Sequence, residues 1–170
     1  MPWKKALMVT VLYLLFLIFV YLCQTFFLCG LKVFGARPLL LPVAAVGIAA
    51  FGGSVKGGAY GLVAGMLCDF SMQRPAIMFT LLLTACCICV GYLYDTVIAG
   101  GFPGYAVCSL GVLIISACFQ MFSPLVYDGE SFLALLSIAV PQTLYSLLFT
   151  LPFYFILRAL HRYESYEYSS

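Results

Sequence analysis

The acidic residues that could do chemistry in this chain stand at the ends of apolar stretches. Asp69 follows a run of glycines, and Asp95 follows Tyr92 and Tyr94. An ionisable side chain inside a membrane is costly and often carries a proton or an ion. The structural alternative for Asp69 is an interfacial acid that caps a helix, pairs with Arg74 or accepts a hydrogen bond from a neighbouring helix. We expect structural roles for both acids.

Other polar side chains lie within apolar stretches or close behind them. Gln120 lies in one such stretch, and Gln142 with Thr143 in another. Such groups hydrogen-bond between membrane helices, typically for about 0.6 kcal/mol, or line a ligand cavity. We expect helix packing here. The single histidine, His161, stands beside Arg162 in a basic segment, which is a poor place for a catalyst.

The residues needed for enzyme catalysis are not gathered anywhere in the sequence. Hydrolysis or group transfer needs a nucleophile, a base and a group that orients the base. No apolar stretch contains a histidine or two acids at helical spacing. The segment at residues 52–56 has neither the length nor the order of a phosphate-binding loop. We therefore expect no enzyme activity and no cofactor.

Eight cysteines are spread along the chain, and all but Cys29 lie within apolar stretches. Cys86 and Cys89 have the C-x₂-C spacing of a zinc ligand pair, but no second pair and no nearby histidine complete a site. Free cysteine behaves as a small hydrophobic residue. We expect these side chains to pack, without metal binding or disulfides.

The composition is that of an integral membrane protein. The chain is 65% hydrophobic and 8% charged, with a mean hydropathy of +1.12. A soluble domain carries about 25% charged residues, so this chain cannot form a water-facing surface. The net charge of +2 is not arranged in a basic stripe, which gives no sign of nucleic-acid binding. We predict one all-α bundle whose surroundings are the lipid bilayer.

The bundle is expected to have six spans within residues 1–162, followed by a short polar tail at residues 163–170 that is disordered. The second and third spans are short, and the turn at residues 52–56 should join them in a tight hairpin. Pro141 and Pro152 predict a kink or a broken turn in the last span. The spans predicted from hydropathy and from glycine and proline punctuation are residues 6–29, 38–51, 57–70, 76–94, 105–122 and 132–157.

The basic residues favour a cytoplasmic position for both termini. Short cytoplasmic segments carry an excess of Lys and Arg. With the N-terminus inside, five basic residues lie in cytoplasmic segments and three lie outside: Lys4, Lys5, Lys56, Arg158 and Arg162 against Lys32, Arg37 and Arg74.

Gly57, Gly61, Gly65 and Asp69 recur every four residues. In a helix they form one slowly drifting face that has almost no side chain until the carboxylate. In water each glycine would weaken a helix by roughly 1 kcal/mol relative to alanine, whereas in lipid small residues let a second helix come close. We predict that this glycine ladder, Gly57, Gly61, Gly65 and Asp69, is a helix-packing or partner interface.

The segment FGGSVKGGAYGLVAGMLCDF at residues 51–70 resembles the glycine-rich helix ending in Asp of the rod shape-determining MreD family. Val90-Gly91-Tyr92-Leu93 is similar to an element of the next span in that family, and the last span runs to a basic end as in that family. The resemblance implies a non-enzymatic scaffold in the bacterial inner membrane. It would hold an MreC-like partner and help couple the MreB filament to the peptidoglycan polymerase and transpeptidase.

The same layout is similar to that of the substrate-binding S components of energy-coupling-factor vitamin transporters, whose fold resembles that of MreD. An S-component-like bundle is expected in either case. For an S component, Ala45 and Ala49 would form a small-residue face for the transporter partner. A polar pocket near the outer side would have only Gln120, Asp128 and Glu130 to line it, whereas pocket specificity needs several convergent polar groups. The scaffold is favoured, and the transporter subunit is the alternative.

Overall fold

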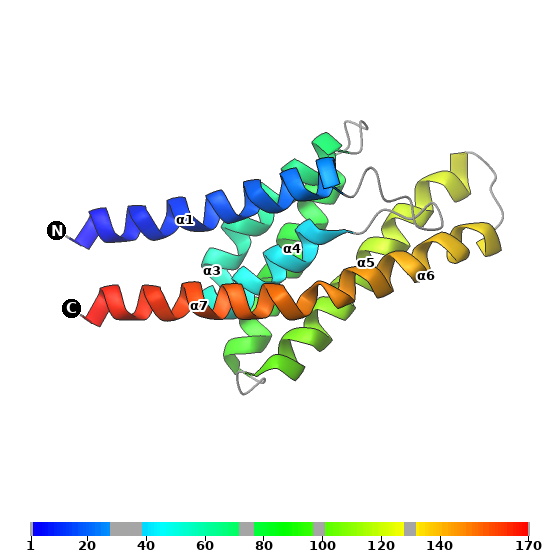
Figure 1. The fold of residues 1–170 in the computed structure, drawn as a ribbon. Coiled ribbons are helices and arrows are strands. Elements are labelled where there is room, and N and C mark those ends of the chain that lie inside the picture. The colour runs from blue at the N-terminus through cyan, green and yellow to red at the C-terminus, as the bar shows by residue number, and fades with distance from the viewer. Residues whose placement is uncertain (1, 28–38, 72–76, 97–100, 128–131, 170) are drawn as a thin grey trace.

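The computed structural model describes residues 2–27, 39–71, 77–96, 101–127 and 132–169, all of them in helices or short connections (Figure 1). Within these ranges five stretches are long and apolar enough to cross a membrane. The protein is therefore an all-helical chain compatible with a multi-pass membrane protein. Its elements are α1 (Pro2–Leu22), the π-helical turn η1 (Cys23–Phe27), α3 (Leu40–Ser71), α4 (Met78–Thr96), α5 (Phe102–Tyr127), α6 (Phe132–Leu148) and α7 (Thr150–Ser169).

α3 is broken at Gly53, which has φ 80° and ψ 177°. A Cβ placed on Gly57 would lie 2.6 Å from the Cβ of Ala49, although eight residues of straight helix span about 12 Å. The chain therefore reverses direction at Gly53. The two segments at residues 40–52 and 54–71 form a hairpin, whose turn lies within the predicted residues 52–56.

The first segment of α3 is the centre of the bundle. Residues 39–50 are buried without exception, because their sequence is apolar all round the helix. Because Gly47 has no side chain, residues of two other helices pack against its backbone. A Cβ at this position would lie 2.2 Å from Leu157 Cδ1 of α7 and 3.1 Å from the hydroxyl oxygen of Tyr105 of α5. That hydroxyl donates a hydrogen bond of 3.0 Å to the carbonyl of Val43. Contacts with α5 and α7 thus meet on one turn of the central segment.

The predicted last span is divided at Phe149 into α6 and α7. Pro152 has no N–H, so the carbonyl of Leu148 loses its usual donor four residues later. Pro141 lies inside α6 without ending it. The prediction of a disordered tail was wrong, because α7 continues to Ser169. No glycine or proline follows Pro152 to end this helix.

α1 and α7 lie side by side in opposite directions, and Figure 1 places both ends of the chain at the same end of the bundle. The rings of Phe16 and Phe153 join the two helices with centroids 5.7 Å apart. We call this end of the molecule the terminal end.

The turn at Gly53 can be tested by substitution. Gly53→Ala should lower the free energy of unfolding by about 1–3 kcal/mol, because this backbone region is essentially restricted to glycine. Gly52→Ala is the control, since its Cβ would meet only the flexible side chain of Lys56. Unfolding of the purified protein by SDS titration measures both. Equal stability of the two variants would contradict a glycine-dependent turn.

Candidate functional site

The glycine ladder faces α4. A Cβ placed on Gly61 would lie 2.8 Å from the Cβ of Cys87, and one on Gly65 would lie 2.5 Å from the Cα of Thr80. At Gly57 the Cys87 carbonyl oxygen would be 3.1 Å away. Carbon atoms in contact normally stay about 3.5–4.0 Å apart. Only glycine therefore permits this approach, which brings one helix backbone onto the other.

α4 contributes a glycine of its own at the opposite end of the contact. A Cβ on Gly91 would lie 2.6 Å from the Cα of Ser54 and 2.8 Å from the carbonyl carbon of Gly53. The second segment of α3 and α4 thus run antiparallel, with close backbone contact from Gly65 to Gly91. Gly91 belongs to the Val90–Leu93 element that carried part of the family resemblance.

Asp69 caps α4. Its Oδ2 accepts hydrogen bonds from the backbone N–H of Thr80 at 3.1 Å and from the Thr80 hydroxyl at 2.5 Å. α4 begins at Met78, so the Thr80 N–H is one of the first-turn donors that have no partner within the helix. A carboxylate is also favoured there by the helix dipole. Of the structural roles considered for Asp69, the structure shows this one; Arg74 lies outside the described residues.

The buried start of α3 is capped by side chains from two other elements. The Gln24 Oε1 of η1 accepts hydrogen bonds from the N–H groups of Leu40 and Leu41, both at 3.2 Å. The Ser146 hydroxyl oxygen of α6 accepts the N–H of Leu39 at 2.9 Å. Ser146 in turn donates to a carbonyl of its own helix.

The next residue of this first turn is Pro42, which has no N–H to satisfy. Every donor at the start of this buried helix therefore has a partner inside the protein, and none is left for an anionic ligand. Sequence reasoning missed Gln24 and Ser146. The available signal was the start of an apolar helix without a capping residue of its own, which requires acceptors from elsewhere.

Two small residues proposed as a transporter-facing surface are in the interior. Ala45 and Ala49 have no exposed surface, and Ala49 packs against Gly57. The expectation of an outward small-residue face at these positions was wrong, because the central segment is surrounded on all sides.

The remaining polar residues do not converge on one site. Thr143 donates to the carbonyl of Ala139 in its own helix, not to a neighbouring helix as expected. Gln120 Nε2 is buried and has no hydrogen-bond partner among the residues described here. Asp95 and His161 lie toward the terminal end, where the His161 ring packs 5.8 Å from the Phe51 ring. Asp128 and Glu130 fall outside the described residues.

The described part of the chain contains no disulfide and no cluster of metal-binding side chains. The seven cysteines found there are free. No group of three or more His, Cys, Asp or Glu side chains in those segments could hold a metal ion.

No family model, curated protein or solved structure matches this chain.

The ladder contact predicts a sharp difference between two identical substitutions. Gly61→Leu should prevent folding, because the added side chain would meet the Cys87 side chain and the Leu83 carbonyl, and overpacking of this kind costs at least about 1–3 kcal/mol. Gly111→Leu on α5 should fold normally, since nothing lies within 4 Å of its Cβ position. The yield of monodisperse protein in detergent measures both, and equal yields would contradict the proposed contact.

The cap at Asp69 predicts that hydrogen-bond acceptance, not charge, is what matters. Asp69→Ala should lower the free energy of unfolding by about 1–2 kcal/mol, whereas Asp69→Asn should lose less because an amide oxygen still accepts. Asp95→Asn is an exposed control. If Asp69 carried a proton, Asp69→Asn would abolish function in cells while leaving stability unchanged.

Proposed function

We propose that this protein is a non-enzymatic scaffold of the bacterial inner membrane, related in layout to MreD. In this role it holds an MreC-like partner and thereby links the MreB filament to the peptidoglycan polymerase and transpeptidase during rod-shaped growth. The resemblance at residues 51–70 and 90–93 supports the proposal.

The observation that carries the proposal is that Asp69, the acid of the glycine ladder, is committed to a helix cap. A proton- or ion-coupled transporter needs an ionisable group in the membrane that is free to change its state. Three further polar side chains form hydrogen bonds with backbone groups of the central segment: Gln24, Ser146 and Tyr105. These hydrogen bonds hold the helices in fixed positions, which suits a protein that acts by binding a partner.

A six-segment arrangement is consistent with this role. The six segments are α1, the two halves of α3, α4, α5, and α6 together with α7. An even number of segments returns the chain to the side on which it began. Figure 1 accordingly shows both termini at the same end of the bundle. The segment at residues 40–52 is about 20 Å long, shorter than the roughly 30 Å of hydrocarbon. It therefore reaches only part of the way across. We place the terminal end in the cytoplasm because of its basic residues.

The partner of such a scaffold must dock away from the ladder. Gly57, Gly61 and Gly65 are buried against α4 or against the first half of α3. Substitutions there would disturb a partner only by disturbing the fold, so partner contacts have to be sought on the lipid-facing sides of the helices.

One observation favours the alternative, a vitamin-binding S component. On α5, Ser116 Oγ and Gln120 Nε2 are one turn apart, buried and without a hydrogen-bond partner in the described segments. An unsatisfied buried polar group costs about 1–3 kcal/mol, which a ligand could recover. Both atoms, however, are covered so completely that a water molecule has no room beside them. Ligand binding would require the helices to move apart, so the scaffold is the better-supported function.

The test is complementation of a rod-shaped bacterium that lacks its own MreD. The tagged chain should restore rod shape and co-purify with the MreC-like protein from native membranes. The Asp69→Asn variant should do the same, because a scaffold needs no titrating group, and Gly61→Leu is the non-folding control. Co-purification with ATPase subunits and a bound vitamin would overturn the scaffold in favour of the transporter. Round cells with a folded chain would also refute it.

A further inference from the structure

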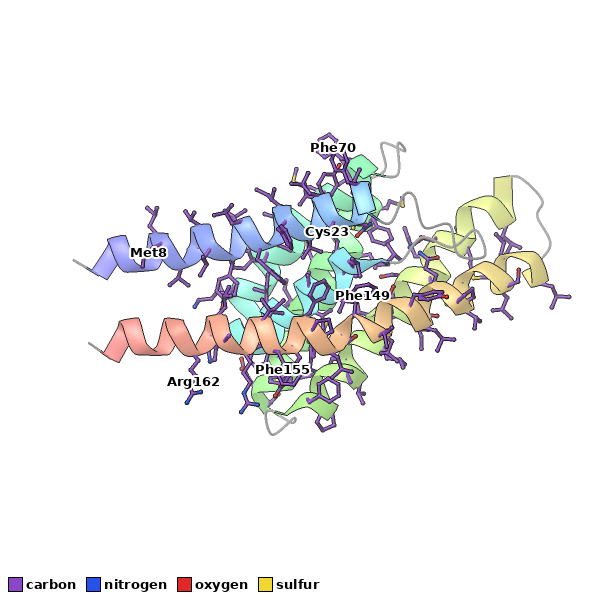
Figure 2. The ribbon with its side chains drawn as sticks, in the orientation of Figure 1. Met8, Cys23, Phe70, Phe149, Phe155 and Arg162 are labelled. Carbon is purple, nitrogen blue, oxygen red and sulfur yellow. The ribbon has the colours of Figure 1, made fainter. Side chains whose placement is uncertain are left out.

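One face of α7 joins apolar side chains to two arginines at the terminal end. Leu151, Phe155, Arg158 and Arg162 are spaced by four, three and four residues, which places them on a single helix face. All four are exposed, Phe155 by 62% and Leu151 by 46%. Figure 2 shows Phe155 and Arg162 on the same side of the α7 ribbon. We call these four residues the α7 face.

Arg158 of the α7 face contacts a tyrosine that is anchored within the bundle. The guanidinium of Arg158 lies 5.9 Å from the centroid of the Tyr154 ring. Tyr154 is buried and packs on the rings of Tyr105 at 5.8 Å and Phe51 at 5.6 Å. This aromatic cluster fixes α7 against α3 and α5, so the outward side of the helix keeps a defined orientation.

The side chains that the structure describes up to residue 162 do not neutralise the positive charge of the α7 face. Neither Arg158 nor Arg162 has an ion pair with any of those side chains. Asp95 lies toward this end, and its carboxylate is beside Gly53 of the α3 turn. Two cations one turn apart on a helix have Cβ atoms about 5–6 Å from each other, a spacing suited to bracketing one phosphate group.

The level of the α7 face in the membrane points to its ligand. The predicted last span, residues 132–157, is followed directly by Arg158 and Arg162, which places the arginines where hydrocarbon gives way to headgroups. Guanidinium groups bind phosphate oxygens in a bidentate manner. One to two turns further into the span, Phe155 and Leu151 face hydrocarbon.

We propose that the α7 face binds an anionic phospholipid, with its phosphate between Arg158 and Arg162 and an acyl chain along Phe155 and Leu151. A zwitterionic lipid brings its own ammonium group next to the arginines, whereas an anionic lipid leaves its negative charge to them. Cations near a membrane surface attract anionic lipids in this way. The inference does not depend on the scaffold function.

The test is native mass spectrometry of the purified full chain titrated with phosphatidylglycerol or phosphatidylcholine. Phosphatidylglycerol should bind at least about tenfold more tightly. The Arg158→Gln/Arg162→Gln double variant should lose about 30-fold in phosphatidylglycerol affinity, or about fivefold for each cation. Phe155→Gln should also weaken binding, and soluble glycerol phosphate should not displace the lipid.

The control is Lys56→Gln, which removes an exposed cation of the α3 turn that lies outside the α7 face. It should change the affinity by less than about threefold. Equal binding of the two lipids would overturn the proposal, as would an equal effect of Lys56→Gln and Arg162→Gln. If the double variant fails to fold, Arg162→Gln alone decides the question. This residue is exposed and follows the predicted span, and an unchanged affinity would refute the site.

Discussion

The close approach of α3 and α4 is the contact on which the rest of this structure depends. Two helices in lipid gain little from burying apolar surface, so their association relies on packing and interhelical hydrogen bonds. Glycines at positions 57, 61 and 65 of α3 and at position 91 of α4 remove the side chains that would hold the backbones apart. Asp69 then ties the end of one helix to the start of the other. The result is a rigid antiparallel pair beside the central segment.

That central segment imposes the second constraint. A helix buried on every side must have its first N–H groups satisfied by the protein, because neither lipid nor water reaches them. Gln24 and Ser146 meet this demand from distant points of the chain. Two polar side chains of apolar stretches are thereby used to cap the central segment.

Much of the architecture could be predicted from local composition. Apolar runs, glycine clusters and proline positions indicate the helices and the turn near Gly53, since each acts over a few residues. The polarity of the segment beyond residue 162 predicts disorder, but α7 continues through it to Ser169 because no glycine or proline ends the helix. The S-component alternative expected Ala45 and Ala49 to face outward, and they are buried. Regularly spaced small residues indicate that another helix comes close, but they do not identify which helix it is.

Two conclusions follow from the amino-acid sequence alone: the chain is all-helical and suited to the membrane, and the ladder face must meet another helix. Those conclusions follow from hydropathy and helical periodicity, which are properties of neighbouring residues. The packing of the helices was needed to show that the other helix is α4 of the same chain and that Asp69 is its cap. It also showed that Leu151, Phe155 and the two arginines of α7 stay uncovered. These outcomes depend on which helices meet across the bundle, and no local pattern contains that information.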